Sequence, residues 1–133
     1  MIGIKEACGD IGQFSKIVNN APNYFKVISG DDGLTLPAIA TGSIGVISVI
    51  ANAMPDKLSQ LTHASLKGNM FEAGQLHLQM AEMMKLIFKE GSPAGVKALM
   101  EMMGTIKNQV RLPNVPVSAG TYGAIETEWK KIR

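Results

Sequence analysis

The chain has 133 residues, enough for one compact domain, and its composition of 46% hydrophobic and 18% charged residues excludes an intrinsically disordered protein. The formal net charge is only +2, and the basic residues are scattered rather than interleaved with aromatic ones. Nothing in the sequence therefore favours nucleic acid or an anionic membrane as a partner.

Three short runs rich in β-branched and aromatic residues predict strands at residues 2–4, 25–28 and 45–49. The third run is almost continuously apolar, which is typical of a strand that helices bury on both faces. Parallel sheets contain most strands of this kind, so we expect the three strands to run parallel.

Helical segments follow each predicted strand. The first spans residues 11–20, with Asp10 as a plausible N-cap. The second spans residues 34–40, after Asp31 and Asp32 and before Gly42, and the third runs from Pro55 to Gly68. This alternation of strands and helices predicts an α/β fold with a parallel sheet or a segment of a barrel.

The second half of the chain has a different pattern. A long amphipathic helix is expected over residues 71–88, where apolar residues recur at helical spacing. Further helices are expected after a Ser92 cap and over residues 119–131. We therefore divide the chain into a partial barrel at 1–68 and a carboxy-terminal helical extension with a tail at 69–133. Three parallel strands do not close a barrel, which takes eight strands and about 250 residues.

Lys5 is the first candidate for chemistry, because it ends a predicted strand, and catalytic groups gather at the carboxyl ends of parallel strands. In an apolar barrel mouth, a lysine loses the hydration that favours its ammonium form, and its neutral amine can attack a carbonyl to form an imine. The alternative is a lysine that snorkels at a strand end beside Glu6 as a solvent-exposed charge.

Two further strand ends carry candidates. After the second strand, Gly30 can let the backbone approach a ligand and Asp31 can contact it, or the two can form a simple turn before the next helix. Ile47 lies in the third predicted strand, where its backbone can line a ligand site or serve only the strand. His63 and His77 are read as exposed helical residues, because no carboxylate or cysteine lies at metal-ligand spacing from them. We predict no metal site.

The single cysteine, Cys8, allows no intrachain disulfide, and the amino terminus has neither an apolar signal region nor a cleavage site. No apolar stretch approaches the roughly 20 residues of a membrane helix. We therefore expect a cytoplasmic protein.

The strand-end motifs occur together in a fixed order: Gly-Ile-Lys-Glu-Ala at 3–7, Ser-Gly-Asp-Asp at 29–32, Gly-Val-Ile-Ser-Val at 45–49, Ser-Pro-Ala-Gly-Val-Lys at 92–97 and Arg-Leu-Pro at 111–113. This ordered set resembles the later part of the dihydrodipicolinate synthases, which are pyruvate-dependent Schiff-base lyases. The resemblance covers about residues 2–116.

The resemblance implies a (β/α)8 TIM barrel, of which this chain would supply the last three βα units and the carboxy-terminal helical region. It implies Lys5 as the catalytic, imine-forming residue. Gly30 and Ile47 would bind pyruvate through their backbone, and Asp31 would lie near the second substrate, aspartate semialdehyde. The product would be 4-hydroxy-tetrahydrodipicolinate, a precursor of lysine and diaminopimelate, formed without a metal or organic cofactor.

The family's first five strands have no counterpart here. They carry a carboxylate-binding loop, a proton-transferring tyrosine and an arginine, so we expect the 133-residue chain alone to be inactive. We expect as partner either further copies in a homo-oligomer or an amino-terminal half. Two alternatives stay open: another 2-keto-acid aldolase such as N-acetylneuraminate lyase, and a non-enzymatic half-barrel that self-associates.

Overall fold

Two short parallel strands, β1 (Gly3–Glu6) and β2 (Lys26–Ser29), form the only sheet in the computed structural model, which describes residues 1–133. Gly3 lies opposite Lys26, and Glu6 lies opposite Ser29. Helix α1 (Ile11–Asn20) connects the strands. Its predicted cap is confirmed, because the Asp10 carboxylate accepts hydrogen bonds from the main-chain N–H groups of the first turn at 2.7 and 3.2 Å.

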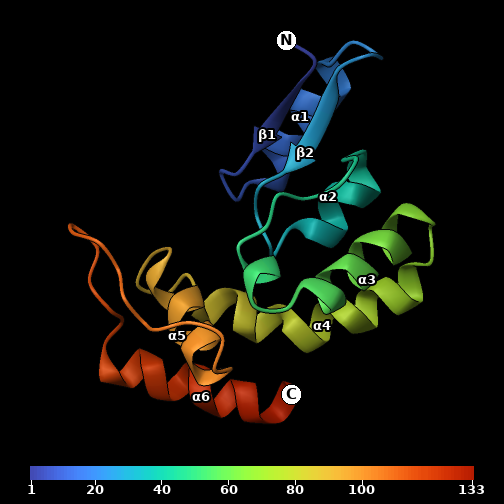
Figure 1. Cartoon of the computed structure of the whole chain (residues 1–133). Helices are drawn as coiled ribbons and strands as arrows, with labels where there is room; N and C mark the ends of the chain where they lie inside the picture. The colour runs from blue at the N-terminus through green and yellow to red at the C-terminus, as the bar shows by residue number, and fades with distance from the viewer. The chain divides into compact units, whose positions relative to one another are not determined.

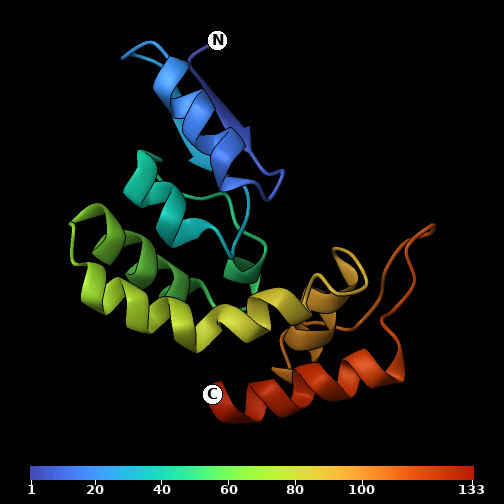
Figure 2. The same ribbon diagram turned by 180° about the vertical axis from the view of Figure 1, so that it is seen from behind.

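One face of this sheet is covered and the other is bare. Val27 of β2 packs in a buried cluster with Phe14 of α1 and Ala38. Ile4 is the register partner of Val27 and therefore points to the same face. Lys5 alternates with Ile4 and points to the opposite face, which Figure 1 shows with no helix in front of it and Figure 2 shows from the α1 side.

The third predicted strand, at residues 45–49, is wrong as a strand. Only Val46 pairs in parallel fashion, with Ser29, and the chain then turns into a short 3-10 helix, η1 (Ile50–Asn52). Main-chain hydrogen bonds do follow the parallel pattern, from Ile47 N–H to Ser29 O at 2.8 Å and from Ser29 N–H to Gly45 O at 3.0 Å. Strand β2 ends at Ser29, so the residues after Ile47 have no strand left to pair with.

The chain divides into two compact units, Met1–Ser48 with Asp56–His77, and Val49–Pro55 with Leu78–Arg133. The first contains the sheet, α1, α2 (Thr35–Thr41), α3 (Pro55–Leu66, less its first residue) and the start of α4 (Met70–Leu86). Gly42 ends α2 with a φ of 120°, as its position in the sequence predicts. No helix in the chain combines the length and apolarity that a membrane crossing needs.

In the second unit, methionines of α4 supply much of the core. Met80, Met83 and Met84 are buried, as predicted, whereas Phe88 at the end of the stripe is 40% exposed. Helix α5 (Ala94–Met102) has Pro93 as its N-cap, and no side chain caps it, so the predicted Ser92 cap is wrong. The backbone of Ile87 approaches α5 so closely that a Cβ at Gly95 would lie 2.1 Å from its carbonyl oxygen.

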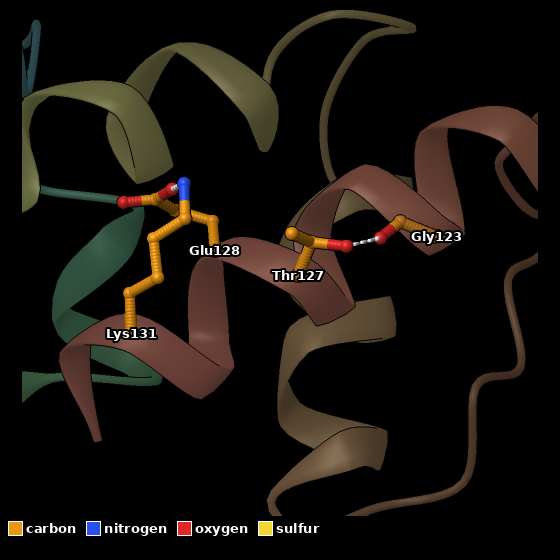
Figure 3. A network of polar contacts seen from close by, with 4 residues as sticks. All are labelled: Gly123, Thr127, Glu128 and Lys131. Carbon is orange, nitrogen blue, oxygen red and sulfur yellow. Dashed lines mark hydrogen bonds and ion pairs between the residues drawn. The ribbon is translucent and has the colours of Figure 1, made fainter.

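Helix α6 (Ala119–Ile132) packs against α5 and begins after a Ser118 N-cap, close to the predicted span. Figure 3 shows two contacts within the helix, in which Thr127 Oγ1 donates to Gly123 O at 2.8 Å and Lys131 Nζ lies 2.7 Å from Glu128 Oε2. Pairs at this spacing contribute only a few tenths of a kcal/mol. The packing on α5 and the cap therefore hold this helix.

Glu90 makes the cap of α6 sensitive to pH. Its carboxylate accepts hydrogen bonds from Ser118 Oγ–H, Thr121 Oγ–H and Ser118 N–H, and these lower the pKa of Glu90 from 4.5 to about 2. A carboxyl group with a lowered pKa in the folded state stabilises the fold above its unfolded pKa. We expect this stabilisation to fade as the pH falls from about 4.5 to about 2.

The measurement is urea unfolding of the chain, followed by circular dichroism between pH 2 and pH 7. Glu90→Gln should lower stability at pH 7 and remove this part of the pH dependence. Glu82→Gln, at an exposed carboxylate on α4, is the matched control and should keep it. An unchanged pH profile for Glu90→Gln would contradict the proposed cap.

Candidate functional site

The carboxyl ends of β1 and β2 bring Lys5 and Gly30 into direct contact. A Cβ added to Gly30 would lie 2.5 Å from Lys5 Cε and 3.0 Å from Lys5 Cγ. The Lys5 alkyl chain therefore lies against the Gly30 backbone. It fills the space that the Cβ of any other residue at position 30 would need. The two strand ends are joined by the hydrogen bond from Gly30 N–H to Glu6 O, at 2.7 Å.

The other two predicted site residues lie in the same region. Ile47 donates its N–H to Ser29 O, one residue before Gly30, and its side chain is half exposed. Asp31 approaches the loop after β1, where a Cβ added to Gly9 would lie 3.6 Å from Asp31 Oδ2. The Asp31 carboxylate also accepts from Leu34 N–H at 3.1 Å, which confirms its predicted place before the second helix.

Two buried serine hydroxyls fix the backbone around these residues. Ser43 Oγ lies 2.7 Å from Gly45 O and 3.2 Å from Val27 O, and it accepts from Ser29 N–H at 3.1 Å. Ser29 Oγ lies 3.1 Å from Asp31 O and 3.3 Å from Asp31 N. Sequence reasoning missed both serines. The contacts of Ser43 with Val27 and Ser29 depend on segments that are distant in the chain, whereas those of Ser29 Oγ lie within the local turn to Asp31.

Glu6 is not the free surface charge that the alternative reading of this motif assumed. Its carboxylate accepts from Cys8 N–H at 2.8 Å and from Gln13 Nε2 at 3.3 Å, which ties the loop after Lys5 to α1. The Cys8 thiol and N–H groups lower the pKa of Glu6, and the same contact raises the pKa of the Cys8 thiol. A raised pKa disfavours the nucleophilic thiolate form of Cys8.

Lys5 itself is exposed, contrary to the expectation of an apolar enclosure. It lies on the bare face of the sheet, and no helix of its own unit covers it. Its amine is thus accessible to a carbonyl compound. Side chains that shield this amine from water would have to come from residues outside β1, β2 and the loops that follow them.

The histidines lie elsewhere. His63 is exposed and its Nδ1 lies 2.7 Å from Ser59 O, whereas His77 is half-buried, so the prediction of an exposed His77 is wrong. His77 Nδ1 is buried without a partner, and burial lowers the pKa of the ring. No three His, Cys, Asp or Glu side chains come together in a group that could hold a metal ion.

The chain matches the model of the dihydrodipicolinate synthetase family over residues 1–132. It is 48% identical over 122 residues to the 4-hydroxy-tetrahydrodipicolinate synthase of Phocaeicola vulgatus, covering 92% of this chain and 41% of that protein. The identity to the same enzyme of Methanosarcina mazei is 41% over 133 residues, covering 99% of this chain and 46% of that protein.

Solved structures give the same result. The crystal structure of dihydrodipicolinate synthase from Thermotoga maritima matches with a TM-score of 0.95 at 36% identity, covering 99% of this chain and 46% of that one. The chloride-inhibited dihydrodipicolinate synthase from Acinetobacter baumannii, complexed with pyruvate, matches with a TM-score of 0.94 at 27% identity, covering 99% and 45%. The chain thus spans less than half the length of these relatives.

Proposed function

Because this chain belongs to the dihydrodipicolinate synthetase family, we propose that it is the imine-forming part of a lyase that condenses pyruvate with aspartate semialdehyde. The product would be 4-hydroxy-tetrahydrodipicolinate, for lysine and diaminopimelate synthesis. The observation that carries the proposal is the placement of Lys5 against Gly30, at the point where the ends of both strands meet Ile47 and Asp31.

The proposed reaction starts with attack of the Lys5 amine on the ketone carbon of pyruvate. Loss of water gives a protonated imine, which acts as an electron sink and lets a proton leave the methyl group. The resulting enamine forms the new carbon–carbon bond with the aldehyde carbon of the second substrate, whose oxygen takes up a proton and becomes the hydroxyl group. The amino group of that substrate then attacks the imine carbon, which closes the ring and releases the product with the Lys5 amine restored. Pyruvate in the Acinetobacter baumannii complex supports the choice of first substrate.

Each of the other site residues has a proposed role. Gly30 and Ile47 would line the pyruvate through their backbone, since Gly30 lacks a side chain and Ile47 is fixed by its bond to Ser29. Asp31 would contact the second substrate, because its carboxylate lies beside Gly9 in the loop that follows Lys5 and β1.

We also propose that β1 and β2 are part of a larger barrel. The peptide groups of Ile2 and Glu6 bond to β2, so those of Gly3 and Lys5 alternate to the opposite edge, where no strand pairs with them. Beside this edge, Ile2 is 82% exposed. An unpaired edge with apolar flanks favours the addition of another strand, and the extra length of the relatives could supply it.

The test is reconstitution with the amino-terminal part of the Phocaeicola vulgatus synthase, which this chain does not cover. A coupled assay should show no measurable turnover for the chain alone and turnover for the mixture. Incubation of the mixture with pyruvate and borohydride, followed by peptide mapping, should place the reduced adduct on Lys5.

The same samples separate the alternatives. Turnover with a 2-keto acid other than pyruvate would favour a related aldolase. Size-exclusion chromatography that shows stable self-association, with neither binding of the amino-terminal part nor an adduct, would favour a non-enzymatic half-barrel.

A further inference from the structure

The side chain of Ser43 lies where three segments of the first compact unit meet, and only 4% of this residue is exposed. The N–H group of Ser43 donates to Ala38 O at 2.8 Å, which anchors its main chain to α2. Its Oγ lies 2.7 Å from Gly45 O and 3.1 Å from Ser29 N. One residue thus joins α2, the end of β2 and the segment that continues to Ile47.

The partners of the Ser43 hydroxyl are all main-chain groups. The hydroxyl has one hydrogen to donate, and Gly45 O is the nearest acceptor. Its oxygen accepts from Ser29 N–H, and Gly45 N–H lies at 3.4 Å. A hydroxyl bonded in this way has no donor left for a substrate, so its effect is on the position of the backbone.

These main-chain groups adjoin the backbone that is proposed to line pyruvate. Ser29 directly precedes Gly30, and Ser29 O accepts from Ile47 N–H at 2.8 Å. The separation between Gly30 and Ile47 therefore depends on how firmly the segment before Ile47 is held against Ser29. That segment is not a regular strand and is linked to β2 by a few main-chain bonds, so the Ser43 hydroxyl adds a substantial share of the attachment.

Lys5 is held by other bonds. It lies on β1, which pairs with β2 through peptide groups that do not contact the Ser43 hydroxyl, and Gly30 N–H donates to Glu6 O at 2.7 Å. Ser43→Ala should therefore loosen the backbone near Gly30 and leave the lysine in place. The variant should remain folded, because the main-chain bonds of the segment after Ser43 do not involve its side chain.

We propose that Ser43 is a positioning residue for the reaction proposed at Lys5, on which this inference rests. Its hydroxyl sets the spacing between the Gly30 and Ile47 backbone groups and thereby the affinity for pyruvate. The rate of imine formation on bound pyruvate depends on Lys5 instead. Ser43→Ala should raise the half-saturating pyruvate concentration about fivefold, as expected for the loss of one buried hydrogen bond, and leave the maximal rate unchanged.

The experiment titrates pyruvate into the mixture of the 133-residue chain and the amino-terminal part of the Phocaeicola vulgatus synthase, with borohydride to trap the adduct. The intact mass of the 133-residue chain at successive times gives the maximal labelling rate and the half-saturating concentration. Ser65→Ala is the matched control, because it removes an equally buried hydroxyl of the same unit, which donates to Leu61 O within α3 at 2.7 Å. This control should label as the parent does.

A hydroxyl that served stability alone would give a different result. Its loss would lower the fraction of folded chain, and hence the maximal labelling rate, at an unchanged half-saturating concentration. That result would overturn the proposal, as would an equal shift in Ser65→Ala or no change in Ser43→Ala. Absence of an adduct with the parent chain would instead refute imine formation at Lys5, and the role of Ser43 with it.

A second measurement reports on the backbone without pyruvate. Hydrogen exchange at the Ile47 amide of the 133-residue chain, followed by NMR, should be faster in Ser43→Ala than in the parent or in Ser65→Ala. An exchange rate that Ser43→Ala leaves unchanged would overturn the proposal whether or not Lys5 forms an imine.

Discussion

Lys5→Arg should abolish the pyruvate adduct that borohydride traps in the reconstituted mixture, reducing labelling to background. Arginine keeps the positive charge and much of the alkyl chain that lies on Gly30, so the local packing changes little. Its guanidinium stays protonated in proteins and does not add to a ketone to form an imine. Intact-mass measurement after reduction reads the result directly.

Lys26→Arg is the matched control for this variant. Lys26 is an exposed lysine of β2 and the register partner of Gly3, so its side chain points to the same bare face as Lys5. The control should label as fully as the parent. Labelling that survives in Lys5→Arg but is lost in Lys26→Arg would place the imine-forming lysine on β2 and refute the proposed mechanism.

Among the glycine-to-alanine changes in this chain, Gly95→Ala should cause the largest loss of stability. The new Cβ would lie 2.1 Å from the carbonyl oxygen of Ile87 and 2.6 Å from its carbonyl carbon, and backbone atoms cannot rotate away. Alanine gains about 1 kcal/mol in helix propensity over glycine. Overpacking of a core costs about 1–3 kcal/mol, occasionally more. The clash here is with backbone atoms, so we expect a cost at the upper end of this range, which outweighs the gain.

Urea unfolding monitored by circular dichroism measures this effect as a lower midpoint. Gly123→Ala, in α6, is the control because nothing lies within 4 Å of an added Cβ there. That change should stabilise the chain by about 0.5–1 kcal/mol. If Gly95→Ala unfolds at the same urea concentration as Gly123→Ala, the close approach of α5 to Ile87 is not real.

Features that depend on neighbouring residues were predictable from the sequence. The Asp10 cap and the end of α2 at Gly42 follow from local backbone chemistry, and the structure confirms both. The meeting of Lys5 with Gly30 was predictable in outline, since the ends of parallel strands lie at one edge of a sheet.

Features that depend on distant partners were not predictable. Residues 45–49 have the composition of a buried strand, but their partner β2 ends at Ser29, and composition does not show where a distant partner ends. The hydroxyl of Ser43 is 14 residues from its partner Ser29, and no sequence period marks such a contact. The exposure of Lys5 and the burial of His77 are likewise set by which segments cover them.

If the proposed roles of Lys5 and of the unpaired β1 edge hold, that edge would link assembly of the barrel to imine formation. The peptide group of Lys5 lies on that edge, so a strand that pairs there would restrict the same residue whose amine is proposed to hold pyruvate. Thermodynamic linkage then makes the effect reciprocal. If association of the added strand favours the reversible imine at Lys5 by some factor, the imine would favour that association by the same factor. Pyruvate would then strengthen assembly of the proposed barrel.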